Sequence, residues 1–201
     1  MRVLVTGGAG NMGREVVALL RQQGDEPIIY DRAETSDANA RACTVGEITD
    51  RDALEHTMRE HRVEGVVHLA AILQFGCEQD PLRAVDVNVN GTIAVLETAR
   101  RTGVKRIVHA SSIAAYGTTE AELHERSPIQ RDVGMYGLTK LLAEALLSRE
   151  GRRHDIVCRT VIFATVLSDR PVSSPGIAAA VAKIVGSAKG DNVTIGEVAA
   201  T

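Results

Sequence analysis

The sequence is poor in aromatic residues and contains no tryptophan: aromatic side chains make up 2% of its 201 residues. Because proteins bind single-stranded nucleic acids by stacking the bases on aromatic rings, a base-stacking surface is not expected. An excess of positive charge is also missing, since the formal net charge is −3 at pH 7. A large nucleic-acid footprint relies on clustered lysine and arginine, so we expect no nucleic-acid partner.

Cysteines are few and widely spaced. The three of them, Cys43, Cys77 and Cys158, form no C-x-x-C pair, which favours buried thiols in a reducing compartment over a disulfide or a metal site. The six histidines include no i, i+4 pair of the metalloprotease type, so no metal is expected, and His68 and His109 are expected in the core.

Long hydrophobic runs are missing as well. No apolar stretch is long enough to span a bilayer, and the first residues show neither the basic leader nor the apolar segment of a signal peptide. We therefore expect a cytoplasmic protein with no membrane partner.

What the sequence does contain is an alternation of apolar strands and amphipathic helices. An apolar fraction of 44% over 201 residues suffices for one domain with a sizeable core. Strands are expected at 2–6, 27–31, 42–45, 65–71, 105–110 and 156–161, and helices at 14–21, after Asp50, at 81–101 and at 135–149. This order predicts an α/β protein with a doubly wound parallel sheet and helices on both faces.

The most informative stretch joins the first strand to the first helix. Gly8, Gly10 and Gly13 form the pattern G-x-G-x-x-G, and Gly7, Gly10 and Gly13 form the interleaved pattern G-x-x-G-x-x-G. Glycine lets the main chain approach a ligand closely, and the N-terminus of the next helix presents unpaired N–H groups to an anion. The order strand, glycine turn, helix indicates a pyrophosphate site, with an ordinary strand-to-helix turn as the alternative.

Asp31 closes the second expected strand, eighteen residues after Gly13. An acid at about this spacing accepts hydrogen bonds from an adenosine ribose. Its charge would repel a 2′-phosphate, so NAD is favoured over NADP, whereas Arg32 next to it could pair with such a phosphate. The alternative is that Asp31 only closes a turn.

Tyr136 and Lys140 form a Y-x-x-x-K pattern within an expected helix. Residues at i and i+4 share one face, so the phenol and the ammonium point into the same space. A nearby cation favours the phenolate, which would make Tyr136 a proton shuttle for an alcohol or a ketone.

Five motifs, in this order, resemble those of the extended short-chain dehydrogenase/reductase superfamily, with the closest likeness to its NAD-dependent epimerase/dehydratase branch. They are Thr6-Gly7-x-x-Gly10-x-x-Gly13, Leu69-Ala70-Ala71, Asn88-Val89-Asn90-Gly91-Thr92, Ser111-Ser112-Ile113-Ala114-Ala115-Tyr116-Gly117 and Tyr136-Gly137-Leu138-Thr139-Lys140. The resemblance implies a Rossmann-type fold, an NAD cofactor and hydride transfer at a hydroxyl-bearing carbon of a sugar-like substrate, either a nucleotide sugar or a sugar acid.

The resemblance also implies roles for individual residues. Ser112 would hydrogen-bond the substrate oxygen, Tyr136 would move the proton, and Lys140 would hold the nicotinamide ribose and tune Tyr136. The implied cofactor contacts are Gly7, Gly10, Asn11, Met12, Gly13, Asp31, Glu47, Ile48, Ala70, Asn88, Tyr136 and Lys140. Glu47 and Ile48 would flank the adenine.

Several positions depart from the family pattern. Glu47 stands where the family usually has Asp. Ser112 is followed by Ile113-Ala114, whereas dehydratases of the branch usually have Asp-Glu there, which argues against 4,6-dehydration. Usual members also continue into a larger substrate lobe. We therefore expect an NAD-binding Rossmann domain with the catalytic residues at 1–165 and a partial remnant of the substrate-binding lobe, most of which is missing, at 166–201.

These observations leave two functional classes open. The first is an NAD-dependent oxidoreductase or epimerase, and the second is a dinucleotide-binding sensor or a truncated, non-catalytic NAD-binding protein. The resemblance further implies a homodimer formed through the helices that hold Leu96 and Leu142, whereas the alternative is that these leucines pack on the sheet.

Overall fold

The computed structural model describes residues 1–118, 122–124 and 126–164. Within this part of the chain, six parallel strands form one sheet in the order β3-β2-β1-β4-β5-β6. The strands are β1 (Arg2–Thr6), β2 (Glu26–Asp31), β3 (Ala42–Val45), β4 (Gly65–His68), β5 (Arg106–Ser112) and β6 (Val157–Phe163). The predicted doubly wound parallel sheet is confirmed.

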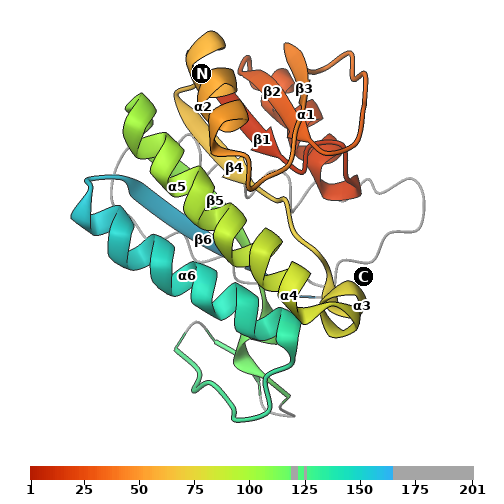
Figure 1. The fold of residues 1–201 in the computed structure, drawn as a ribbon, viewed down its shortest axis with the longest axis vertical. Helices are drawn as coiled ribbons and strands as arrows, with labels where there is room; N and C mark the ends of the chain where they lie inside the picture. Colours follow the sequence, from red (N-terminus) through yellow and green to blue (C-terminus); the bar gives the residue numbers. More distant parts are fainter. Residues whose placement is uncertain (119–121, 125, 165–201) are drawn as a thin grey trace.

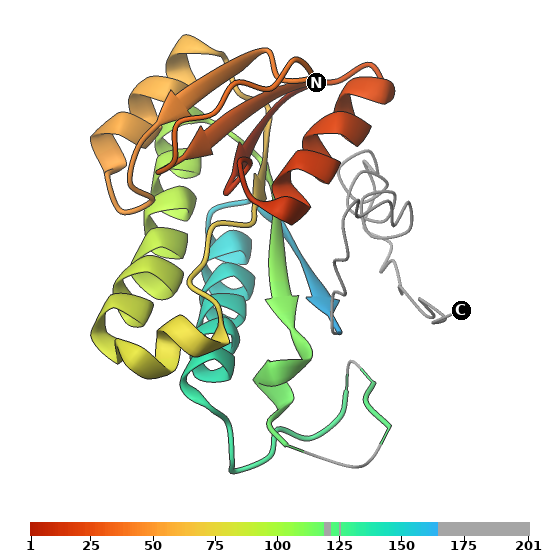
Figure 2. The same cartoon turned by 90° about the vertical axis from the view of Figure 1, so that its right-hand side faces the viewer.

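Helices cover both faces of this sheet (Figures 1 and 2). They are α1 (Asn11–Gln22), α2 (Arg51–Glu60), α3 (Gln74–Gln79), α4 (Pro81–Ala84), a π-helical turn η1 (Val85–Asn90), α5 (Gly91–Thr102), a 3₁₀ turn η2 (Ile113–Tyr116) and α6 (Met135–Arg153). Helix α1 lies on one face, and α2, α5 and α6 lie on the other.

The two faces follow from the alternation of side chains along each strand. Val3 and Val5 of β1 pack with Val16 of α1, while Leu4 packs with Leu54 of α2 in a second core. Successive strand residues point to opposite faces, so a strand buried on both sides is apolar throughout. This arrangement accounts for the nearly continuous apolar runs of the sequence.

Several expected elements differ in their boundaries, and two of these differences bear on the site. The fourth strand was expected at 65–71 but ends at His68, and residues 69–71 instead form part of the connection that leads to the site. The expected helix 81–101 is divided into α4, η1 and α5, and α3 precedes it unpredicted. A six-residue helix is too short to show helical periodicity, and a π-helical turn keeps the chain helical while shifting its hydrogen bonding.

Other details of the sequence interpretation are confirmed. Asp50 caps α2, because its Oδ1 accepts a hydrogen bond from the Ala53 N–H at 2.9 Å. No helix in the described part of the chain is both long and apolar enough to cross a membrane. The expected boundary at 165 and the segment 166–201 lie outside the described residues, so the two-part division stays a prediction.

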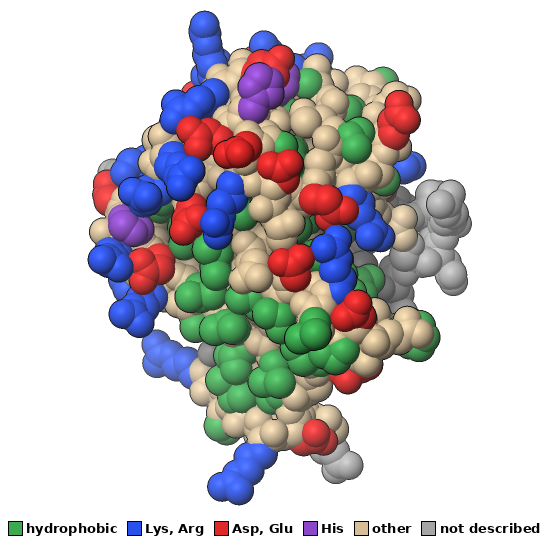
Figure 3. All heavy atoms as spheres, viewed as in Figure 1, with side chains coloured by type: hydrophobic (Ala, Val, Ile, Leu, Met, Phe, Trp, Pro, Cys, Tyr) green, Lys and Arg blue, Asp and Glu red, His purple; other side chains and the backbone are tan. Residues whose placement is uncertain are grey.

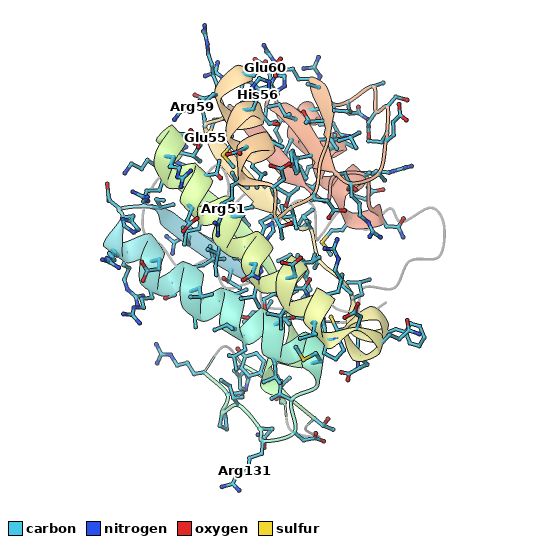
Figure 4. The ribbon with its side chains drawn as sticks, viewed as in Figure 1. Arg51, Glu55, His56, Arg59, Glu60 and Arg131 are labelled. Atoms are coloured by element: carbon cyan, nitrogen blue, oxygen red, sulfur yellow. The ribbon has the colours of Figure 1, made fainter. Side chains whose placement is uncertain are left out.

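Ion pairs join the outer surfaces of α2 and α5. Arg51 pairs with Glu97 at 3.0 Å, and Glu55 pairs with Arg59 at 2.8 Å and with Arg101 at 3.5 Å. Figure 4 shows Arg51, Glu55 and Arg59 along α2. Because exposed ion pairs contribute little to stability, this cluster is not what holds the fold together.

Candidate functional site

A cleft of about 730 Å³ lies beyond the carboxyl ends of the strands. Strand β1 has β2 on one side and β4 on the other, so the chain connections leave β1 and β4 in opposite directions. This is the topological switch point at which open α/β sheets bind ligands. The predicted residues that line the cleft are Gly7, Gly10, Asn11, Met12, Gly13, Asp31, Glu47, Ile48, Ala70, Ser112, Tyr136 and Lys140.

The glycine loop is shaped by close main-chain contacts. Gly7 has a φ of +71°, and a Cβ there would lie 2.8 Å from the backbone nitrogen of Ala70. A Cβ on Gly13 would lie 2.3 Å from the carbonyl oxygen of Gly7. Both positions therefore require glycine for steric reasons.

Helix α1 begins directly after this loop. Its N-cap is Gly10, no side chain caps the helix, and its first turn carries no acidic residue. The first N–H groups of an α-helix have no acceptor within the helix. The first residues of α1, Asn11, Met12 and Gly13, line the cleft. A helix N-terminus that opens on a cleft in this way can bind an anion.

Asp31 connects the end of β2 to the glycine loop. One carboxylate oxygen accepts a hydrogen bond from the Ala9 N–H at 3.0 Å, and the other accepts one from the Ala33 N–H at 3.0 Å. Asp31 therefore does close a turn, through Ala33, and it also lines the cleft. Each carboxylate oxygen can accept a further hydrogen bond from a ligand hydroxyl.

Glu47 and Ile48 lie at the same end of the cleft as Asp31. The Tyr30 hydroxyl donates to the carbonyl oxygen of Glu47 at 3.0 Å, and burial, with smaller contributions from Asp50 and Glu47, raises the pKa of Tyr30 to about 12. Tyr30 is thus a neutral donor that fixes the Glu47 backbone.

Asn88 is the predicted cofactor contact that does not line the cleft. Its side chain is buried, and its Oδ1 accepts from the Ile72 N–H at 2.7 Å while its Nδ2 donates to the Ile72 carbonyl oxygen and to Thr139 Oγ1, each at 3.0 Å. Asn88 thus fastens the connection after β4, which forms one wall of the cleft, to α6. Asn88 therefore positions the wall of the cleft, in place of the direct cofactor contact that its motif predicted.

Ser112, Tyr136 and Lys140 meet at the opposite end of the cleft from Glu47. Ser112 ends β5, and its Oγ accepts a hydrogen bond from the Ala114 N–H at 3.2 Å. Tyr136 lies in the first turn of α6, with the Lys140 Nζ 5.7 Å from the centroid of its ring. Lys140 donates to the carbonyl oxygen of Ala110 at 2.8 Å. The residues that the sequence grouped by motif are therefore grouped in space.

The electrostatics of Tyr136 correct one expectation. Burial, followed by the nearby Cys77, raises the pKa of the Tyr136 phenol instead of lowering it. Lys140 Nζ lies 5.7 Å from the ring centroid and donates to Ala110, and its charge does not offset the effect of burial, so the pKa of Tyr136 is not lowered overall. The buried Tyr136 therefore carries its proton in this structure.

Lys140 is almost fully buried, and burial lowers its pKa to about 8, against opposing effects of Cys77 and Glu144. The remaining groups around it are two neutral, buried histidines, because burial lowers the pKa of His68 to about 3 and that of His109 well below its usual value. Their predicted core position is confirmed, with ring centroids 5.7 Å apart.

The buried Lys140 predicts a pH dependence of stability. The folded pKa lies below the unfolded one, so between about pH 8 and the unfolded value of 10.5 the unfolded chain binds more protons, and stability rises with pH. From about pH 8 to about pH 10, wild type should gain about 2 kcal/mol in free energy of unfolding relative to Lys140→Met. Urea unfolding of both proteins at each pH measures this, and a constant difference would contradict the assignment.

Some cleft residues escaped the sequence reasoning. Tyr30, Arg83, Ser111 and Phe163 also line the cleft, and Ser111 donates to the half-buried Glu144 of α6. Tyr30 directly precedes Asp31 in the sequence, and this position could have indicated that Tyr30 lies near the cleft. Arg83 belongs to no motif recognised in the sequence, and only the packing of its helical segment brings it to the cleft.

Comparisons with known proteins support this geometry. The model of the NAD dependent epimerase/dehydratase family matches residues 3–197. The chain is 32% identical over 160 residues to UDP-glucose 4-epimerase of Erwinia amylovora, covering 73% of this chain and 48% of the relative. It is 33% identical over 164 residues to UDP-glucose 4-epimerase of Bacillus subtilis (strain 168), covering 73% and 47%. The chain thus spans about half the length of these curated relatives.

Solved structures show the same likeness. The crystal structure of UDP-glucose 4-epimerase from Brucella ovis in complex with NAD superposes with a TM-score of 0.75 and 30% identity, over 82% of this chain and 52% of that one. An L-threonine dehydrogenase from Cupriavidus necator, in its holo form, superposes with a TM-score of 0.79 and 28% identity, over 85% and 57%.

Proposed function

The chain belongs to the NAD dependent epimerase/dehydratase family, and we propose that it binds NAD in its cleft and catalyses hydride transfer at a hydroxyl-bearing carbon of a sugar-like substrate. One observation carries this proposal: the glycine loop at the start of α1 and the set Ser112, Tyr136 and Lys140 line the same cleft. If the glycine loop were only a strand-to-helix turn, nothing would require it to line the same cleft as Ser112, Tyr136 and Lys140.

The residues present fit an NAD molecule. The N–H groups of Asn11 and Met12 would hold the pyrophosphate, Asp31 would accept from the adenosine ribose, and Glu47 would lie beside the adenine. Lys140 would hold the nicotinamide ribose. Glycine at Gly13 keeps the main chain of this cradle closely packed, because a Cβ there would meet the backbone of Gly7.

When bound, NAD supplies a hydride acceptor or donor for the substrate carbon. Tyr136 moves the proton at the substrate oxygen, and the Ser112 hydroxyl hydrogen-bonds the same oxygen and stabilises developing negative charge on it. Lys140 is fixed by Ala110, and its charge stabilises the phenolate that forms once Tyr136 has given up its proton. Burial thus stabilises the protonated form of Tyr136, whereas the charge of Lys140 stabilises its phenolate form.

The substrate class that we propose is a nucleotide sugar or a sugar acid. It is supported by the likeness to UDP-glucose 4-epimerases. The likeness to an L-threonine dehydrogenase with the same fold supports a hydroxy amino acid as the alternative substrate. The experiment is an assay of the purified chain with NAD and each class: UDP-glucose, sugar acids and L-threonine. Chromatography detects UDP-galactose formed from UDP-glucose, and absorbance detects NADH. Turnover on a sugar supports the proposal, whereas bound NAD without turnover on any class would favour the non-catalytic alternative.

We also propose that the chain forms a homodimer through α5 and α6. Figure 3 shows hydrophobic side chains gathered over α6 and the adjoining end of α5. On α6, the side chains of Leu138 and Leu142 are exposed. An exposed apolar patch of this kind marks an interaction surface. Leu96 does not belong to it, because this side chain is 5% exposed and packs in the core against the sheet.

Leu142→Glu is expected to convert the dimer into a monomer, since a charge placed within an apolar interface loses its hydration without gaining a partner. Sedimentation velocity measures the change. Val157→Glu provides the matched control, because Val157 is similarly exposed but lies on β6, outside the patch, and it should leave the sedimentation coefficient unchanged. A wild-type chain that sediments as a monomer would overturn the dimer proposal.

A further inference from the structure

An ion pair closes the end of the cleft where Glu47 lies. The Arg83 guanidinium, in α4, donates from Nη2 to Glu47 Oε2 at 2.9 Å and from Nη1 to Asp86 Oδ2 at 3.0 Å. Arg83 and Glu47 both line the cleft, although they are thirty-six residues apart in the sequence. The pair thus joins the connection after β3 to the helical segment on the other side of the cleft.

Glu47 is held at two points. The Tyr30 hydroxyl fixes its carbonyl oxygen at 3.0 Å, and Arg83 fixes its Oε2. Within the described residues, the second carboxylate oxygen, Oε1, has no hydrogen-bond partner. A half-exposed carboxylate in a cleft, anchored through one oxygen, keeps the other oxygen in place to accept a hydrogen bond.

Anchoring matters because a glutamate side chain is flexible. A free glutamate loses rotamer freedom when it binds a ligand, and this loss reduces the affinity. Arg83 fixes the carboxylate before a ligand arrives, and Asp86 fixes Arg83 in turn. The three side chains therefore form a preorganised acceptor for a donor group on the ligand.

We propose that Arg83 is a positioning residue: it orients Glu47 so that Oε1 can accept a hydrogen bond from the exocyclic amine of the bound adenine. This inference rests on the proposed function, in which Glu47 lies beside the adenine of NAD. A base with a carbonyl oxygen in place of that amine would set one acceptor against another, and it would bind less tightly. The pair therefore distinguishes adenine from hypoxanthine.

The same geometry argues against a purely structural role. The side chains of Arg83 and Glu47 are 39% and 50% exposed, and exposed ion pairs contribute little to stability. Removing the guanidinium should therefore leave the melting temperature nearly unchanged while it changes ligand recognition.

The test is a calorimetric titration of the full chain with NAD and with nicotinamide hypoxanthine dinucleotide. Wild type is expected to prefer NAD by about tenfold, the value of one hydrogen bond to a charged group. Arg83→Gln is expected to reduce this preference to about twofold or less, mainly through weaker binding of NAD, and Glu47→Gln should reduce it as well. Melting curves of each variant verify that the chain is folded.

Arg32→Gln is the matched control. Arg32 lines the same end of the cleft, and its replacement removes the same charge, but Arg32 makes no ion pair with Glu47 in the described part of the chain. Any loss in this variant should affect both dinucleotides alike. An unchanged preference in Arg83→Gln, or an equal loss for both dinucleotides, would overturn the role of Arg83 while NAD binding itself persists. A wild-type chain that binds neither dinucleotide would instead overturn the proposed function, and with it this inference.

Discussion

Tyr136→Phe is expected to lower kcat by about a thousandfold and to leave the affinity for NAD within about twofold of wild type. The substitution removes one hydroxyl and keeps the ring, so the packing at the start of α6 is retained. What is lost is the group that carries a proton in the structure, because burial raises its pKa. Steady-state kinetics on the substrate found in the assay measures kcat, and calorimetry measures NAD binding.

The two readouts separate a chemical role from a structural one. A variant that loses turnover and NAD binding together would show that Tyr136 supports the cleft, and equal turnover in the variant would refute the assigned proton transfer. Ser112→Ala gives an intermediate comparison, since Ser112 stabilises charge but moves no proton, and a loss of about a hundredfold is expected for it.

Gly13→Ala is expected to weaken NAD binding by at least about a hundredfold, because the added Cβ would lie 2.3 Å from the Gly7 carbonyl oxygen and 2.6 Å from the Gly8 Cα. Both contacts are with backbone atoms, so the loop itself must move. A displaced loop no longer presents the N–H groups of α1 to a pyrophosphate. Calorimetric titration with NAD measures the loss.

Gly103→Ala is the control for this prediction. Gly103 ends α5 with a φ of +80°, and a Cβ there would meet nothing within 4 Å. This variant should lose about 1 kcal/mol of stability, because alanine is strained at that φ, yet it should bind NAD like wild type. Equal NAD affinity in Gly13→Ala and wild type would mean that the glycine loop is not the phosphate site.

The sequence predicted much of the fold because periodicity and composition are local signals. The runs at 2–6 and 42–45 coincide with β1 and β3, and Asp50 caps α2 as expected. The segment 81–101 is divided into α4, η1 and α5, and all three pack against α6, a tertiary contact that no local pattern encodes. For the same reason, the expected strand at 65–71 ends at His68.

Site residues were predictable where a motif reflects a steric requirement of the main chain. They were not predictable where a contact depends on how distant segments pack. Gly7 and Gly13 are required by close main-chain approach, so the sequence revealed them. Arg83 contacts Glu47 from a segment that is distant in the sequence. The Asn88 amide forms its hydrogen bonds inside the protein and not at the cleft. The direction of the Tyr136 pKa shift follows from burial, which a sequence pattern does not show.

The central claim is that the cleft at the carboxyl edge of the sheet is an NAD site, and the measurement that tests it most directly is calorimetric titration of the purified chain with NAD. The account predicts saturable binding of one NAD per chain, with an affinity that the Gly13→Ala substitution removes. A chain that is folded by circular dichroism and shows no saturable binding of NAD would contradict it.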